Sequence, residues 1–568
     1  MHCPLHSILS ILILLPLSLG KLPSLDRLHA AHLRARSDRQ TPHQGDENDH
    51  LLAPRTDDAE SKWLNDRTAP FSVNRTGFPN VSFELPESYA GLLPIDEGSG
   101  RELFFWFVPS ENKAAEAEVV IWLNGGPGCS SLLGFSQENG PFNWMSGLYE
   151  PVRNHYAWNN LSNIVWIEQP VGTGYTRGQP NATSEDDIVR QFSGFWKSFV
   201  DLFELHNSKI YITGESYAGM YVPYIADYFL NQSDTTYFNV SGIMIYDPAI
   251  NHDVVLQDAP VLSLIENNRN AFPFNNSFDE YIRNRSSACG FDDLLVEGLK
   301  FPPDGHFDLP KGAFPNGSAT HDCTTWDDAA TAAFYLNPCF NYYQVTQLCP
   351  IPWDVMGFPS SIFYLPSGYP GTYFNRSEVK SALNVPQDAN WTTCSDKPVF
   401  IGGADNSSDL SAPSGLNGGP LARVTERTNN VIIGTGNLDM VIITNGTLIS
   451  LNNMTWNGAQ GFSKPPDEPF YVPDHDIPSV ESMAGIGILG SWGADRGLTY
   501  VAVELSGHAV PGFAQSAGYR HLELLLGRIA NFSDTSPFTT QPDYPQPDGP
   551  LGKGTSPPQQ ACEGDELE

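Results

Sequence analysis

The segment after the apolar run 210–213 carries the strongest chemical signal in the chain. It reads GESYAG over residues 214–219, so that Ser216 lies among small residues, and an amphipathic helical pattern follows it. Small neighbours permit the tight strand-to-helix turn that raises a serine hydroxyl above a sheet, where it can attack a carbonyl carbon. An ordinary turn serine is the alternative. We favour a nucleophile, because both the strand-like run and the helical pattern are present.

A serine hydroxyl needs a base, and this kind of turn takes an acid and then a histidine from later in the chain. Asp439 follows the apolar run 431–433, and His508 follows the apolar run 500–503 in the segment SGHAVP. We predict that Asp439 orients His508 and that His508 is the base for Ser216. The other histidines after Asp439 lie in a Pro-rich stretch and in a leucine-rich final helix, where we expect surface positions: His475 and His521.

A glycine-rich segment follows the apolar run 119–123 and reads NGGPGCSS over residues 124–131. Consecutive glycines let the backbone approach a ligand closely, and their N–H groups can face the negative oxygen that develops in acyl transfer. The residue after the nucleophile supplies a second donor, here the N–H of Tyr217. A purely structural turn would not need so many glycines. We therefore interpret 124–131 as an oxyanion loop.

These segments need a rigid scaffold. Short apolar runs alternate with helical patterns along the chain, which predicts the strands and helices of such a scaffold. The strand candidates are residues 103–108, 119–123, 164–167, 210–213, 243–246, 431–433 and 500–503. Between residues 188 and 203, apolar side chains recur every three or four positions, which predicts a helix with one apolar face. This alternation predicts an α/β sheet.

The two ends and one internal region depart from that alternation. Residues 1–20 contain an apolar run too short to span a bilayer and end in small residues, as signal peptides do. Residues 251–395 are rich in proline and asparagine and hold most of the cysteines, which predicts an inserted, disulfide-stapled cap. The predicted organisation is a signal peptide 1–20, a propeptide or flexible leader 21–60, core 61–250, cap 251–395, core 396–533 and a disordered Pro-rich tail 534–568.

Composition and sequence signals indicate export from the cytosol. The formal net charge of −34 argues against nucleic acid or an anionic membrane surface as a partner. About fifteen Asn-x-Ser/Thr sites, spread from Asn74 to Asn531, fit a glycosylated surface. We expect a protein of the secretory pathway, outside the cell rather than in the vacuole, with no membrane span.

Three segments together resemble the signatures of the serine carboxypeptidase family (peptidase family S10). They are NGGPGCSS at 124–131, GESYAG at 214–219 and GHAVP at 507–511, and the similarity extends over residues 65–530. Within the family the chain looks most like the fungal carboxypeptidase S1 branch. The resemblance implies an α/β-hydrolase fold, which is a mixed, mostly parallel sheet with flanking helices, and here it would carry the cap.

By this resemblance Ser216 is the nucleophile, His508 the general base and Asp439 its orienting partner. The resemblance assigns the oxyanion N–H groups to Gly126 and Tyr217. It also implies a set of residues that binds the terminal carboxylate of the substrate: Asn124, Gly125, Glu138 and Glu215.

The chain between its two ends contains six cysteines, an even number that fits three disulfides in an oxidising compartment: Cys129, Cys289, Cys323, Cys339, Cys349 and Cys394. No spacing among them matches a metal site. The resemblance implies that Cys129 pairs with Cys394. The sequence leaves the other four open, and we favour a nested arrangement: Cys289–Cys349 around Cys323–Cys339.

We therefore expect a serine carboxypeptidase that hydrolyses the last bond of peptides with a free C-terminus through an acyl-enzyme. It should prefer acidic pH, because two adjacent carboxyl groups such as Glu138 and Glu215 cannot easily both ionise. No metal or organic cofactor is required. Two alternatives stay open, an esterase or acyltransferase on the same fold and a non-catalytic binding protein.

Overall fold

The computed structural model describes residues 61–310, 320–357, 372–404, 406–475, 485–544 and 546. The chain divides into two units, residues 1–62 and 63–568, and the second unit is described below. The predicted signal peptide and leader lie outside the described residues. Among the described residues, no helix combines the length and the apolarity needed to cross a membrane.

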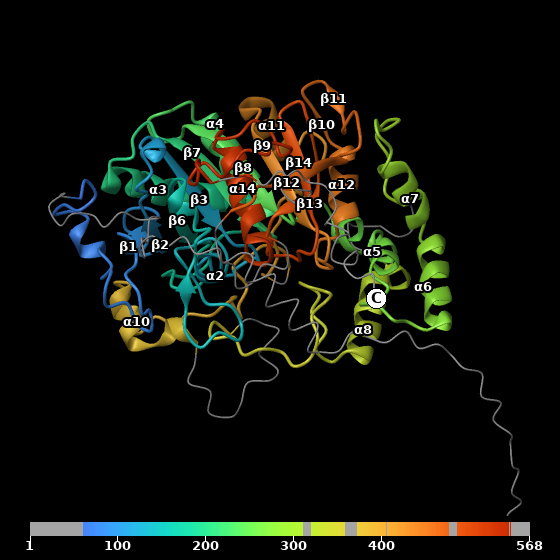
Figure 1. The fold of residues 1–568 in the computed structure, drawn as a ribbon, viewed down its shortest axis with the longest axis horizontal. Coiled ribbons are helices and arrows are strands. Elements are labelled where there is room, and N and C mark those ends of the chain that lie inside the picture. Colours follow the sequence, from blue (N-terminus) through green and yellow to red (C-terminus); the bar gives the residue numbers. More distant parts are fainter. Residues whose placement is uncertain are drawn as a thin grey trace, which may run out of the picture. The chain divides into compact units, whose positions relative to one another are not determined.

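Ten strands of the described chain form one sheet in the order β1-β2-β6-β3-β7-β8-β9-β14-β13-β12 (Figure 1). The strands from β6 to β14 run parallel, and antiparallel pairs complete both edges. All seven strand candidates are confirmed. The bounds are β1 Tyr89–Pro94, β2 Glu102–Val108, β6 Asn163–Glu168, β3 Glu118–Leu123, β7 Lys209–Glu215, β8 Val240–Tyr246, β9 Val431–Gly436, β14 Leu498–Val503, β13 Gly487–Asp495 and β12 Glu468–Val472.

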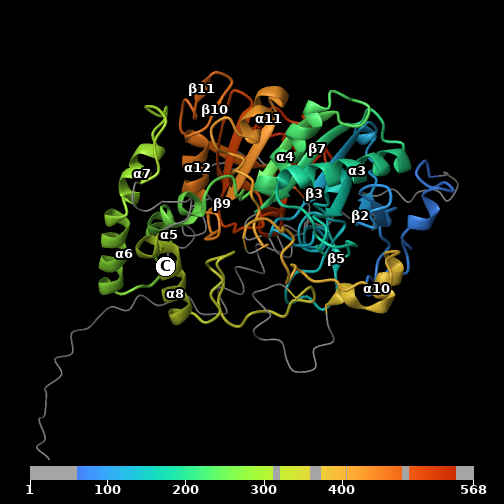
Figure 2. The same ribbon diagram turned by 180° about the vertical axis from the view of Figure 1, so that it is seen from behind.

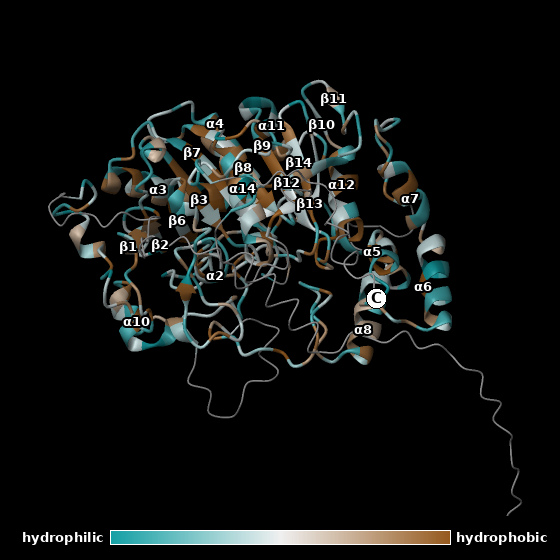
Figure 3. Ribbon diagram, viewed as in Figure 1, coloured by the Kyte–Doolittle hydropathy of each residue, from teal (hydrophilic) through white to brown (hydrophobic). Residues whose placement is uncertain are grey.

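Alternate side chains of the central strands enter two apolar cores, one on each face of the sheet. On β2, Phe105 and Phe107 enter one core, whereas Phe104 and Trp106 enter the other. Figure 3 shows these strands as mainly apolar. Helices α3 (Glu185–Phe203), α4 (Ala218–Asn231) and α11 (Pro420–Thr428) cover the first core, and α2 (Leu132–Gln137), α10 (Ser377–Ala382) and α14 (Gln515–Leu525) the second. The periodic apolar face predicted over residues 188–203 is the buried face of α3.

The predicted cap region contributes a group of helices that both ribbon views place beside α12 (Thr444–Asn452) (Figures 1 and 2). They are α5 (Val261–Asn267), α6 (Asn276–Ala288), α7 (Phe291–Gly298) and α8 (Thr325–Leu336). Apolar side chains of α5 and α8 pack with Leu438 and Met440, the two neighbours of Asp439 in sequence. The cap therefore helps to fix the loop that carries Asp439. The remaining short elements are β4 (Phe142–Asn143), β5 (Val152–Arg153), β10 (Thr455–Trp456), β11 (Ala459–Gln460) and α13 (Val510–Phe513).

Three disulfides join cysteines of the described chain. Cys129 is bonded to Cys394, so the glycine-rich loop after β3 is tied to a segment 265 residues later. The other bonds are Cys289–Cys323 and Cys339–Cys349. The nested arrangement that we favoured is therefore wrong. Each of these four cysteines is bonded to its neighbour in the sequence.

The folded chain also continues past residue 533, where we expected disorder to begin. Phe538 is fully buried, and Thr539 donates from its backbone N–H and its hydroxyl to Glu523 on α14, both at 2.6 Å. The predicted boundary is wrong for residues 534–544, because an aromatic anchor and a buried acceptor hold this stretch. Residues 547–568 lie outside the described part.

Candidate active site

Ser216 follows β7 directly, at the C-terminal edge of the parallel strands. Its φ of +61° is a left-handed conformation that non-glycine residues rarely adopt, and its N–H donates to the carbonyl of Tyr246 on β8 at 2.9 Å. A Cβ on Gly214 would lie 2.3 Å from a carbonyl oxygen of β3, and one on Gly219 would lie 2.5 Å from a backbone nitrogen after β8. The small residues are therefore required by packing, as expected of a nucleophile turn.

Asp439 and His508 meet across the loops that follow β9 and β14. His508 Nδ1 lies 2.7 Å from Asp439 Oδ2. The carboxylate of Asp439 is fully buried and also accepts the N–H groups of Val441 at 2.7 Å and Ile442 at 3.1 Å. The His508 ring packs against that of Tyr343, with centroids 5.2 Å apart. His508 Nε2 is buried and bonds to no other described residue, so this nitrogen is available to accept a proton.

The electrostatic surroundings favour a charged His508. Burial alone would lower its pKa, because a dry environment disfavours the imidazolium. The charge of Asp439, the hydrogen bond to Nδ1 and the charge of Glu215 act in the opposite direction and prevail, so the pKa of His508 is raised. An imidazolium formed during a reaction would therefore be stabilised where it forms.

The glycine-rich loop 124–131 lies directly against the Ser216 turn. A Cβ on Gly125 would lie 2.3 Å from Tyr217 N and 2.9 Å from Ser216 Cβ, so a side chain cannot be placed there. Gly126 has a φ of +113°, a left-handed conformation that favours glycine. Within the described chain, the N–H groups of Gly126 and Tyr217 donate to no backbone carbonyl or side chain. Two unused donors thus stand beside the serine turn.

Two buried carboxyl groups, called the carboxyl pair below, lie next to this turn: Glu138 at the end of α2 and Glu215 just before Ser216. They are 4% and 8% exposed. Asn124 Nδ2 donates to Glu215 Oε1 at 2.7 Å and lies 3.5 Å from Glu138 Oε1, while Trp122 Nε1 donates to Asn124 Oδ1 at 2.8 Å. No lysine or arginine of the described chain forms an ion pair with either carboxyl group.

Both carboxyl groups of the pair have raised pKa values. Burial is the largest cause of the raised pKa of Glu138, and the charge of Glu215 and the hydrogen bond between the two groups raise it further, well above its usual value. Burial also raises the pKa of Glu215, although the charge of His508 and hydrogen bonds from Glu138 and Asn124 oppose it. The two groups titrate together, and while the pair holds a proton it can donate a hydrogen bond to an anionic ligand.

Asp247 is a buried residue of this site that the sequence analysis missed. It follows β8 directly, and side-chain atoms of Asp247, Asp439 and His508 all lie within 4.8 Å of one another. A signal was available, because an acidic residue stands at the end of the strand next to the nucleophile strand, in the segment YDP at 246–248.

The prediction that His521 is a surface residue is wrong. It is fully buried on α14, and its Nδ1 lies 3.0 Å from the Tyr246 hydroxyl. Burial lowers the pKa of His521 to about 3, so the ring stays neutral and acts as a core residue. His475 is partly buried, and its Nε2 lies 2.5 Å from the Tyr156 hydroxyl.

Comparisons with known proteins identify the family. The serine carboxypeptidase family model matches residues 79–527. A probable serine carboxypeptidase of Arthroderma benhamiae is 46% identical over 483 residues, which cover 83% of this chain and 88% of that protein. Serine-type carboxypeptidase F of Aspergillus niger is 44% identical over 483 residues, covering 82% of this chain and 88% of that protein.

The fold is similar to the crystal structure of Kex1, a prohormone-processing carboxypeptidase from Saccharomyces cerevisiae. The TM-score is 0.62 at 22% identity, and the match covers 82% of this chain and 98% of that chain. The predicted α/β-hydrolase fold, with its mostly parallel sheet and flanking helices, is thus confirmed. Because the family model spans most of the sequence and the fungal relatives align over more than four fifths of it, the chain belongs to the serine carboxypeptidase family.

Proposed function

We propose that this enzyme removes single residues from the C-terminus of peptides by acyl transfer through Ser216, His508 and Asp439. Ser216 Oγ attacks the carbonyl carbon of the last peptide bond while its proton passes to His508 Nε2. The oxyanion accepts hydrogen bonds from the N–H groups of Gly126 and Tyr217. His508 then returns the proton to the leaving amine, and the same base activates the water that hydrolyses the acyl-enzyme.

The observation that carries the proposal is the buried carboxyl pair, of which Glu215 directly precedes the serine. A terminal carboxylate can accept hydrogen bonds from the carboxyl pair while it holds a proton and from Asn124 Nδ2, which lies 2.7 Å from Glu215. Because Glu215 and Ser216 are adjacent in sequence, an anchored carboxylate puts the last peptide bond, rather than an internal one, at the nucleophile.

The acidic preference follows from the ionisation of the pair and acts on peptide binding. The pKa of Glu138 is raised, so its proton is present in acid and is lost as pH rises through that raised value. The site then presents negative charge to a negative ligand, and KM for peptides climbs. His508 sets the other limit, because its raised pKa means that the neutral base is lost as pH falls.

The rival activities use the same nucleophile but have no need of the carboxyl pair. An esterase or acyltransferase would bind a substrate without a free carboxylate, and a binding protein would not need a base with an unused Nε2. Both are less well supported than a carboxypeptidase, since family membership and the carboxyl pair agree.

We also propose that the enzyme acts outside the cytosol, in the extracellular space rather than the vacuole. The apolar run in residues 1–20, the Asn-x-Ser/Thr sites and the net charge of −34 support this. Three disulfides fit an oxidising compartment.

The test compares KM against pH for one peptide and for its C-terminal amide, in the wild type and in Glu215→Gln. KM for the peptide should rise above neutral pH, whereas KM for the amide should change little. Glu215→Gln should keep peptide binding at higher pH, because an amide donates hydrogen bonds without ionising. Parallel curves for the peptide and its amide in the wild type would exclude a role for the carboxyl pair in reading the terminal carboxylate.

A further inference from the structure

Asp247 occupies an unusual position beside the proposed triad. It is fully buried at the end of β8, with a φ of +41°. Its N–H donates to the carbonyl of Gly434 on β9 at 2.8 Å, so the backbone directly after β8 stays bonded to the neighbouring strand. Apart from glycine, aspartate and asparagine are the residues that adopt this left-handed backbone most readily.

The side chain of Asp247 is only half satisfied by the backbone. Oδ1 accepts the N–H of Gly436 at 3.0 Å, whereas no N–H or hydroxyl group of the described residues donates to Oδ2. The titratable groups that face it from the surrounding elements are Asp439, His508, Glu215, Tyr246 and Tyr500. No lysine or arginine of the described chain is paired with it.

Two carboxyl groups this close in a dry site cannot both be charged, so one of them carries a proton. Asp439 already accepts two backbone N–H groups and His508 Nδ1, which stabilise its ionised form. Asp247 accepts one backbone N–H. Burial, the charge of Asp439 and their mutual hydrogen bond raise the pKa of Asp247 well above its usual value. The proton therefore belongs to Asp247.

We propose that Asp247 is a positioning residue of the catalytic apparatus, which donates a hydrogen bond as a neutral carboxylic acid from Oδ2 to the carboxylate of Asp439. This donor fixes the carboxylate plane while Oδ2 of Asp439 faces His508. It also draws electron density from Asp439 and so limits how strongly the imidazolium is held. The inference rests on the triad assigned in the proposed function.

Two substitutions separate the hydrogen bond from the fold. Asp247→Asn keeps the shape, tolerates left-handed backbone, donates through its amide to Asp439 and accepts from Gly436 through its carbonyl. Asp247→Gly accepts the same backbone but removes the donor. We expect kcat of the Asn variant to stay within about threefold of wild type, and kcat of the Gly variant to fall about 10- to 100-fold, the loss typical of a displaced catalytic group.

The pH profile identifies the charge state of Asp247. In Asp247→Gly the acid limb of kcat should move to higher pH, because Asp439 without its donor holds the imidazolium more strongly. In Asp247→Asn the limb should stay in place. Peptide KM should change little in either variant, since neither touches the carboxyl pair. Thermal unfolding checks that both proteins are folded.

Each alternative outcome has its own reading. Wild-type kcat in Asp247→Gly, or equal losses in both variants, would overturn the hydrogen-bond role. An acid limb that moves to lower pH in Asp247→Asn would show that Asp247 is ionised in the working enzyme, which also overturns it. Ser216→Ala, measured in the same assay, tests the triad independently: if that variant stays active, the proposed function fails, and this inference fails with it.

Discussion

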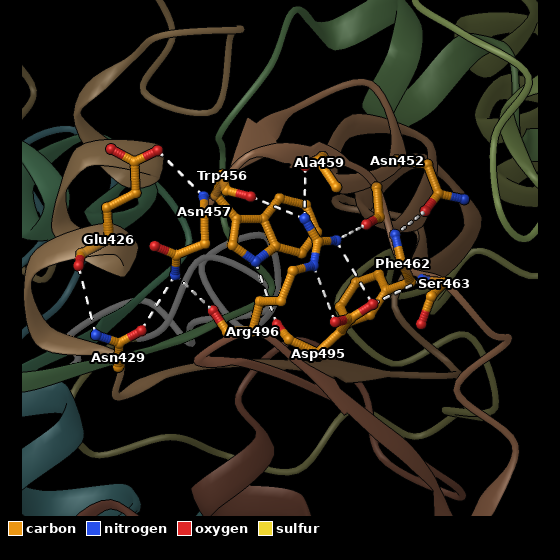
Figure 4. Close-up of polar contacts among 11 residues, drawn as sticks. Glu426, Asn429, Asn452, Trp456, Asn457, Ala459, Phe462, Ser463, Asp495 and Arg496 are labelled. Carbon is orange, nitrogen blue, oxygen red and sulfur yellow. Dashed lines mark hydrogen bonds and ion pairs between the residues drawn. The ribbon is translucent and has the colours of Figure 1, made fainter.

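The carboxyl pair and Arg496 both place ionisable groups in buried or partly buried surroundings, but of the two only Arg496 forms an ion pair within the described residues. Arg496 lies in the turn between β13 and β14, and its Nε donates to Asp495 Oδ1 at 2.9 Å. Its terminal nitrogens donate to three carbonyl oxygens in the segment 456–461, and the guanidinium lies 4.3 Å from the centroid of a Trp456 ring (Figure 4).

The pKa values of the carboxyl groups differ accordingly. At Asp495, burial would raise the pKa, but hydrogen bonds from Arg496 and Ser463 prevail and lower it. At Glu138, burial and a second carboxyl group act together and raise it. A charge that only closes a hairpin has a permanent partner within the chain. The carboxyl pair has no such ion pair, and the partner that we propose for it is the terminal carboxylate of a substrate, which binds and leaves.

The largest expected effect separates chemistry from stability at the site. Ser216→Ala should lower kcat by about 10⁴-fold or more, because only the nucleophile is lost. The melting temperature should not fall, because alanine fits the turn and, like serine, has to adopt the left-handed φ. Kinetics, labelling with a fluorophosphonate and thermal unfolding check this. Label on a different serine, or an active variant, would show that Ser216 is not the nucleophile.

At the Arg496 cluster the opposite pattern is expected. Arg496→Ala should lower the free energy of unfolding by about 2–3 kcal/mol, because it leaves a partly buried carboxylate and three carbonyls without their donor. The kcat for peptides should be unchanged. Arg190→Ala is the matched control, since Arg190 pairs with Asp187 at the surface with 59% of its side chain exposed. It should cost less than about 1 kcal/mol. Chemical denaturation measures both, and equal losses would contradict the comparison.

The two sites should also respond to pH with opposite signs. The raised pKa of Glu138 means that its contribution to stability is present below the unfolded value and is lost as pH rises through the folded value. In Glu138→Gln the free energy of unfolding should therefore fall less steeply as pH rises, by up to about 1.4 kcal/mol per pH unit for one proton. Asp495 has a lowered pKa, so its ionised form stabilises the fold above its unfolded value, and the wild type loses this contribution only in acid. Asp495→Asn should lack the contribution at every pH. Unfolding curves from about pH 2 to about pH 8 cover the acid loss at Asp495 and the alkaline decline at Glu138, and slopes of the same sign would refute the contrast.

The smallest effect expected is a shift of the acid limb by Glu215→Gln. The charge of Glu215 helps to raise the pKa of His508, so its removal should move the acid limb of kcat to lower pH. An ester substrate without a free carboxylate isolates this effect from peptide binding. A limb that stays in place would mean that Glu215 is neutral during turnover.

Much of the fold could be predicted because parallel strands that are buried on both faces have continuous apolar sequences. β13 was missed for the opposite reason, since it reads GILGSWGAD and most of its side chains are partly exposed. The serine turn was predictable because packing restricts the residues around it to small ones. Such steric rules act within a few residues of the chain and leave a local pattern.

Asp247 and His521 show where sequence reasoning ends. A polar residue buried by contacts from distant elements has no local pattern of its own: His521 is buried by Tyr246, Phe470 and Phe532, from other parts of the chain. The cap disulfides are a similar case, because four cysteines allow three pairings and the spacing does not choose among them.

The strand order also determines when this enzyme becomes able to act. β8 and β9 are neighbours in the sheet, yet the whole cap is synthesised between them. Ser216 leaves the ribosome on the early side of the cap, and the proposed base arrives only when β9 and β14 add to the existing edge. Closing so long a loop is entropically slow. The nascent chain thus carries Ser216 before His508 and Asp439 have been made, and we expect hydrolytic activity only after β9 and β14 have joined the sheet.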